Sequence, residues 1–110
     1  MTTTTKAIRI SSTIVLMIQR IIHQISVRSA VPSMSSRLDI DATIESLVEA
    51  TGAIMQDDRQ RAIALLRSAS ETIALVVEDV ENDGRVLESV RYNLRDGRNA
   101  IDGLIINYFS

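Results

Sequence analysis

The part of the sequence that most resembles a ligand site is the acidic run Asp79–Gly84, which reads Asp-Val-Glu-Asn-Asp-Gly. It matches the first half of a calcium-binding EF-hand loop, where oxygen ligands alternate along the chain and a bidentate carboxylate stands at the twelfth position. The ninth and twelfth positions here are Leu87 and Val90, whose side chains have no oxygen. We therefore predict a solvated acidic turn in which Asp83 caps the following helix, with a calcium site as the alternative, and we expect no cofactor.

Few residues in this chain are suited to catalysis. His23 is the only histidine, and on the first expected helix it shares the polar side with Arg9 and Arg20, without a carboxylate or cysteine in register. Cysteine is absent, and no base is spaced to activate one of the many serines and threonines. Helical metal centres bridged by carboxylates use Glu-x-x-His on inward faces, and this sequence lacks that pattern. We predict that the protein is not an enzyme and binds no metal.

Arginines form a stripe at Arg91, Arg95 and Arg98 on the last expected helix. Nucleic-acid binding would favour such a stripe on a basic domain with interleaved aromatic side chains. This part of the chain is acidic, and the whole chain has only three aromatic residues. We therefore predict ion pairs with Glu71 or Glu78 on the neighbouring helix, with nucleic-acid contact as the alternative.

Charge is distributed unevenly along the sequence. No acidic residue precedes Asp39, and the five cations of that part are Lys6, Arg9, Arg20, Arg28 and Arg37. The remainder has seven arginines against all 14 acidic residues, a net charge of −7, so the whole chain carries −2. We expect the two parts to compensate each other within one fold. The alternative is that Arg9, Arg20 and Arg28 contact nucleic acid or an anionic membrane surface.

Hydrophobic periodicity predicts four helices in a single domain, residues 1–110. Apolar residues recur at alternating steps of three and four, which is the spacing of a packed helical seam. The clearest seam belongs to the third helix and consists of Ala62, Leu66, Ala69, Ile73, Val76 and Val80. The expected helices lie near 6–28, 40–56, 58–81 and 84–109, with a Ser/Pro linker at 29–38. Together they predict an all-α, mostly antiparallel four-helix bundle.

Local signals refine these elements. Asp39 or Asp41 can cap the second helix, and Asp57 with Gln60 resembles a capping box before the third. Gly97 falls within the seam of the last helix, where its missing side chain would permit a close helix crossing. The expected inner face of the second helix consists of Ile44, Leu47, Val48, Thr51, Ile54 and Met55.

The first helix has the broadest apolar surface, about half of its circumference. Such a helix needs more than one neighbour, either within the chain or by exchange between two copies. Alternation at 8–10 leaves a short strand as an alternative there. Polar residues interrupt the apolar stretch, so we expect no transmembrane helix, although the acid-free N-terminus also suits a targeting segment. The apolar face of this helix consists of Ile10, Ile14, Ile18, Ile21 and Ile25.

Excess apolar surface is the main indication of function, because large exposed patches are unusual on monomers. We predict a cytoplasmic, non-enzymatic module that binds another protein or itself, with a homodimer as the first expectation. The alternative is a regulator that binds nucleic acid or a membrane through its basic N-terminal helix. The interface candidates are Ile8, Val15, Leu16, Ile22, Ile105, Ile106 and Phe109.

Overall fold

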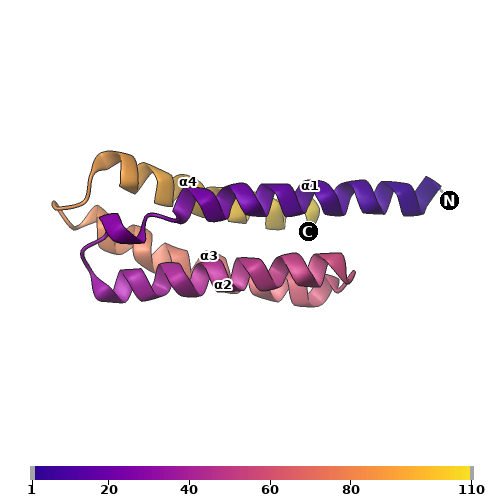
Figure 1. Ribbon diagram of the computed structural model, residues 1–110, viewed down its shortest axis with the longest axis horizontal. Coiled ribbons are helices and arrows are strands. Elements are labelled where there is room, and N and C mark those ends of the chain that lie inside the picture. Colours follow the sequence, from indigo (N-terminus) through magenta and orange to yellow (C-terminus); the bar gives the residue numbers. More distant parts are fainter. Residues whose placement is uncertain (1, 110) are drawn as a thin grey trace.

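Four α-helices and one short 3-10 helix make up the chain between residues 2 and 109, a range that contains no strand. The computed structural model describes the backbone of residues 2–109 and the side chains of residues 10–109. Successive helices run in opposite directions along the long axis, which confirms the all-α four-helix bundle (Figure 1). The elements are α1 (Thr2–Ile25), η1 (Arg28–Ala30), α2 (Met34–Met55), α3 (Arg59–Glu81) and α4 (Glu88–Tyr108).

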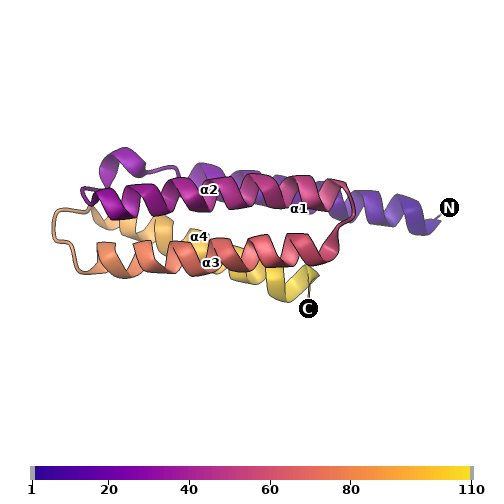
Figure 2. The same cartoon turned by 90° about the horizontal axis from the view of Figure 1, so that it is seen from below.

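The helices form a ring of neighbours around one aliphatic core. α3 packs against α2 and α4, and α1 completes the ring by packing against the same two helices. In Figure 2, α2 and α3 lie side by side in front of α1 and α4. α1 is also the helix that extends furthest, since its N-terminal end passes beyond the α2–α3 turn and the end of α4 (Figures 1 and 2).

The seam of α3 is the centre of this core. All six of its predicted residues, from Ala62 to Val80, are fully buried. The predicted seams of α4 and α1 are buried as well over most of their length, which confirms the three- and four-residue spacing as the packing signal. The buried aliphatic residues of these two seams are Ile14, Ile18, Ile21, Ile25, Val90, Leu94, Ile101 and Leu104.

The predicted inner face of α2 was partly wrong. Val48 and Met55 are 56% and 73% exposed, whereas the small residues Ala50 and Ala53 are fully enclosed. The buried face of α2 is therefore rotated toward small residues, which the spacing of the large apolar residues did not indicate. The buried residues of α2 are Ser36, Ile40, Thr43, Leu47, Ala50, Ala53 and Ile54.

The linker predicted at 29–38 is shorter than expected, because α2 begins at Met34 and η1 occupies 28–30. Ser33 is the N-cap: its backbone is extended, and its Oγ accepts a hydrogen bond from the backbone N–H of Ser36 at 3.3 Å. Asp39 and Asp41 therefore lie inside the helix and do not cap it. The serine run that resembled a flexible linker is the first turn of α2.

The other predicted caps also shift. α3 begins after Asp58, whose Oδ1 accepts from the backbone N–H of Arg61, while Asp57 has a φ of 57° and ends the preceding turn. α4 begins at Glu88 without a side-chain cap, so Asp83 does not cap it. At the N-terminus α1 begins at Thr2 and ends at Ile25, earlier than predicted at both ends, and the alternative strand at 8–10 is helical.

Gly97 lies where α1 and α4 approach most closely. A Cβ added to Gly97 would fall far inside van der Waals contact of Cγ2 of Ile25, a fully buried residue of α1. The predicted close crossing at Gly97 is therefore confirmed. Gly103, two turns further along α4, has no neighbouring atom within 4 Å of the corresponding position.

These two glycines provide a matched pair of substitutions. We expect Gly97→Ala to lower the free energy of unfolding by about 1–3 kcal/mol, because the added methyl group must push Ile25 away. Gly103→Ala should raise it by about 0.5–1 kcal/mol, because alanine is the better helix former and has room. Urea unfolding monitored by circular dichroism measures both; an equal gain in the two variants would show that α1 does not depend on Gly97.

Candidate interaction surfaces

The acidic turn after α3 uses its side chains to hold the fold together. Asp79 Oδ2 accepts a hydrogen bond from Oγ of the buried Ser36 at 2.5 Å, which ties α2 to α3. Asp83 accepts from Nε and Nη2 of Arg85, both at 2.9 Å, and its carbonyl oxygen accepts from Arg91 Nη2 at 2.7 Å. Among the described residues no three His, Cys, Asp or Glu side chains gather as a metal site. These side-chain contacts therefore stabilise the fold.

Arg85 also changes the acidity of the turn. Its hydrogen bonds hold the pKa of Asp83 below the usual value for an aspartate, because they stabilise the ionised carboxylate. A lowered folded-state pKa stabilises the fold at every pH above the ordinary aspartate pKa. That contribution is lost as the pH falls through the lowered pKa.

We expect Arg85→Ala to raise the pKa of Asp83 toward the ordinary value, since the cause of the shift is removed. A carbon-detected NMR titration of the aspartate carboxyl groups measures this. Arg67→Ala is the matched control, since it removes an exposed arginine from the middle of α3 and should leave the Asp83 titration unchanged. An Asp83 pKa that stays low in Arg85→Ala would contradict this account of the turn.

The arginine stripe of α4 forms ion pairs, but not with the predicted partners. Arg95 Nε lies 3.0 Å from Glu81 and its Nη2 lies 3.1 Å from Glu88, and Arg91 lies 3.6 Å from Glu88. Glu81 of α3 is paired in place of Glu71 or Glu78, because the relative register of two helices is not encoded in the spacing within either one, whereas Glu88 belongs to α4 itself and was missed. Arg98 is exposed and forms no ion pair with the described residues.

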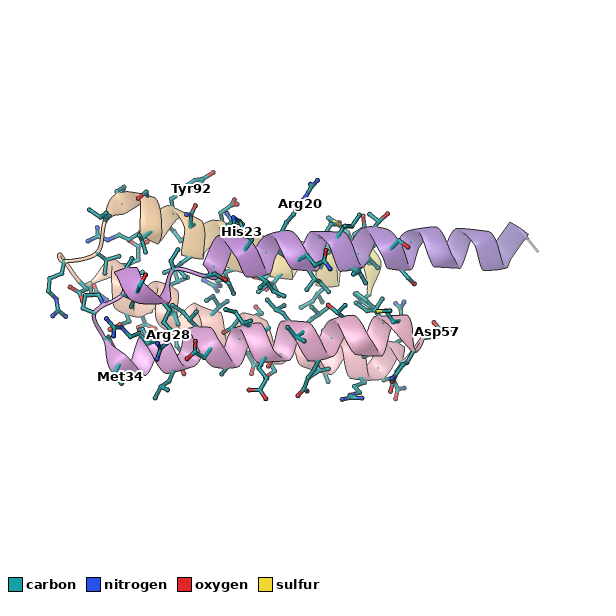
Figure 3. All side chains as sticks on the ribbon, in the orientation of Figure 1. Arg20, His23, Arg28, Met34, Asp57 and Tyr92 are labelled. Atoms are coloured by element: carbon teal, nitrogen blue, oxygen red, sulfur yellow. The ribbon has the colours of Figure 1, made fainter. Side chains whose placement is uncertain are left out.

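Only some of the basic residues of the N-terminal part form ion pairs within the fold. Arg28 Nε lies 3.0 Å from Asp41, which is the internal compensation expected from the charge pattern. Arg20 and His23 are exposed on α1, and Arg20 points away from the bundle (Figure 3). Arg9, like the interface candidate Ile8, lies outside the residues whose side chains are described.

The other interface candidates divide into two groups. Leu16 on α1 and Ile106 on α4 are 59% and 67% exposed. The remaining four are half-buried against the core: Val15, Ile22, Ile105 and Phe109. Sequence reasoning missed several exposed large apolar residues, some because it assigned them to the core and others because they lie outside the seams. The missed residues are Ile10, Met34, Leu38, Val48, Met55, Leu75, Leu87 and Tyr92.

Many of these exposed residues gather at the two ends of the bundle. Met34 and Leu38 lie at the beginning of α2, and Leu87 lies just before α4 at the same end. Met55 ends α2 at the opposite end, where α4, with Ile106 in its last turn, also terminates (Figure 1). This second end is also where α1 leaves the bundle.

A shallow groove of about 200 Å³ opens at the end from which α1 projects. We call it the end groove. Asp57 and Asp58 form its polar edge, and Arg59 stacks over the Phe109 ring at 5.5 Å while Nη1 donates to the carbonyl oxygen of Tyr108. The apolar residues that line the end groove are Ile10, Ile14, Ile54, Ala62, Tyr108 and Phe109.

A second pocket, near η1, is lined mainly by arginines and serines. Ser26, Arg28, Ser29, Arg37 and Ile44 line it. Arg28 pairs with Asp41, Arg37 Nε donates to the carbonyl oxygen of Val31, and Ser26 Oγ donates to that of Ile22. Its polar groups therefore serve the connection between α1 and α2.

By length and composition, the stretch Ile10–Ala30 would suffice to cross a membrane. A core helix of a soluble protein passes the same test, and Ile14, Ile18, Ile21 and Ile25 are core residues here. The stretch also runs past the end of α1 into η1, so its continuous helix covers only 10–25. Composition alone therefore does not assign α1 to a membrane.

Comparisons with known proteins gave no relative for this chain: no family model, no curated protein and no solved structure matches it.

Proposed function

We propose that this protein is a non-enzymatic helical module that binds protein chains, including a second copy of itself. The observation that supports this most directly is the exposure of ten large apolar side chains among residues 10–109. Single exposed apolar residues are ordinary on a protein surface. Their concentration at the ends of the bundle, next to an apolar groove, is typical of surfaces that another chain covers.

The polar groups of the molecule favour the same proposal over catalysis. Asp79, Asp83 and Arg95 are engaged in contacts between or at the ends of helices. His23, the only histidine, is exposed on α1. General acid–base chemistry needs a positioned donor or acceptor in a site that receives a substrate. The groove at the end from which α1 projects is instead lined mainly by apolar side chains, and the larger pocket near η1 has arginine and serine side chains that contact Asp41 and backbone carbonyl groups.

Self-association is the direct test of this proposal. We expect the purified chain to form a dimer whose population rises with concentration in the micromolar range, measured by sedimentation equilibrium. Because the driving force is apolar, the association should persist in 0.5 M salt, at which exposed ion pairs are screened. A monomer at every concentration up to about 1 mM would contradict self-association.

A second candidate function is attachment to an anionic membrane surface through α1. The observation that favours it is the outward orientation of Arg20 beside the exposed Leu16 on a helix of membrane-compatible length. In this case α1 would lie on the surface with its basic side toward the lipid headgroups. The apolar contact available on that side is small, so binding would depend mainly on charge.

Vesicle sedimentation tests this second function. If it is correct, the chain binds vesicles containing 30% phosphatidylserine at low salt and is released in 0.5 M NaCl, and the triple variant Arg9→Ala, Arg20→Ala, Arg28→Ala does not bind. The matched control removes three arginines from α3: Arg59→Ala, Arg61→Ala and Arg67→Ala. Equal loss in both triple variants, or no binding by the original chain, would argue against a membrane role for α1.

A further inference from the structure

The apolar seam of α1 does not end where the bundle ends. Ile14, Ile18, Ile21 and Ile25 are at most 4% exposed, and the seam continues at the same spacing to Ile10, which is 41% exposed. The next seam position is Ala7. The seam becomes exposed at Ile10 because α2, α3 and α4 end there, while the apolar spacing of α1 continues.

Residues 2–9 of α1 precede the exposed Ile10, and we call this part of the helix the overhang. Eight residues at 1.5 Å each give a length of about 12 Å. Figures 1 and 2 show that none of the other helices accompanies it. Two turns of isolated helix are marginal in water, because most helical stability in proteins comes from packing. The overhang therefore needs a surface to pack on.

The end groove at the base of the overhang offers such a surface, but in another molecule. Its apolar wall is formed by Ile54, Tyr108 and Phe109 together with Ile10 itself. A helix that points away from its own groove cannot turn back into it without breaking. A second copy that approaches in the opposite direction would bring its overhang to this groove.

Charge favours a second copy as the occupant. The sequence of the overhang contains Lys6 and Arg9 and no acidic residue. Asp57 at the edge of the end groove is exposed and forms no ion pair with the described residues, whereas the neighbouring Arg59 is directed onto Phe109 and the end of α4. One end of the molecule thus has a projecting helix whose sequence is basic and a groove with an apolar wall and an acidic edge. Self-complementarity of this kind is what an interface with twofold symmetry requires.

We infer that two copies of this chain associate end to end around a twofold axis, each overhang covering the end groove of the other copy. The overhangs lie antiparallel, so that Ile10 of both copies becomes buried and the positive charge of each overhang, to which Lys6 contributes, compensates the charge of Asp57 of the partner subunit. This inference rests on the proposed self-association and specifies the surface that mediates it.

Two substitutions on α1 test which face is used. Ile10→Glu places a charge in the inferred interface, and Leu16→Glu places the same charge on the opposite side of the same helix. Both positions are exposed, so both variants should fold, which circular dichroism checks. In sedimentation equilibrium Ile10→Glu should weaken dimerisation at least a hundredfold and Leu16→Glu less than threefold. A dimer that resists Ile10→Glu, or that Leu16→Glu disrupts instead, would overturn the inference and leave the proposed function intact.

A mixing experiment tests whether the contact joins two molecules. Lys6→Glu and Asp57→Lys should each weaken the homodimer about tenfold, because two like-charged pairs replace two opposite ones. A mixture of the two variants restores both pairs in the heterodimer, one of them reversed, so heterodimers should exceed the statistical half of all dimers in native mass spectrometry. Glu45→Lys, which makes the same charge change in the middle of α2, is the control and should show no such preference with Lys6→Glu.

The outcomes separate the two proposals. An original chain that is monomeric throughout the concentration range contradicts the proposed self-association and the end-to-end dimer together. A dimer with a statistical distribution of heterodimers contradicts the end-to-end dimer alone.

Discussion

The enclosed seam of α3 determines the positions of the other helices. Its six residues are fully buried, which requires a neighbouring helix on each side, and α2 and α4 provide these neighbours. The two neighbours contribute different side chains to the core, since α2 buries the small residues Ala50 and Ala53 and α4 buries larger ones such as Leu94. α1 then fills the remaining side of the ring, against α2 and α4 rather than against α3.

Apolar seams alone allow helices to slide along one another, and polar links fix their positions. Three neighbouring pairs have one: Ser36 with Asp79 joins α2 to α3, Ser70 with Asp102 joins α3 to α4, and Gln24 donates to Asp96 at 2.6 Å between α1 and α4. The Arg28–Asp41 pair joins η1 to α2. A shift by one helical turn in any pair would break the link and leave polar groups with no partner, some of them partly buried.

Features that are local to one helix could be predicted from the sequence, whereas features that depend on two helices could not. The seam of α3 and the crossing at Gly97 were predicted correctly, since both follow from spacing within one helix and from the absence of one side chain. The face of α2 and the pairing of Arg95 with Glu81 were predicted incorrectly, because each depends on how two helices meet; the pairs with Glu88, which lie within α4, were missed. Ile10 illustrates the same limit for the candidate site. Its spacing assigned it to the core, and only the lengths of the other helices show that the core ends before it.

The close approach of α1 and α4 at Gly97 has a consequence for the reach of the molecule. Ile25 sits in the notch that this glycine leaves, so the contact fixes the longitudinal position of α1 relative to α4. If the notch stood one helical turn further along α4, α1 would be displaced by about 5.4 Å, and a different length of it would protrude. The absence of a side chain at Gly97, in the middle of the bundle, thus determines how far the N-terminal end of α1 protrudes. A substitution at Gly97 would therefore change the position of the N-terminal end of α1 without changing any residue there.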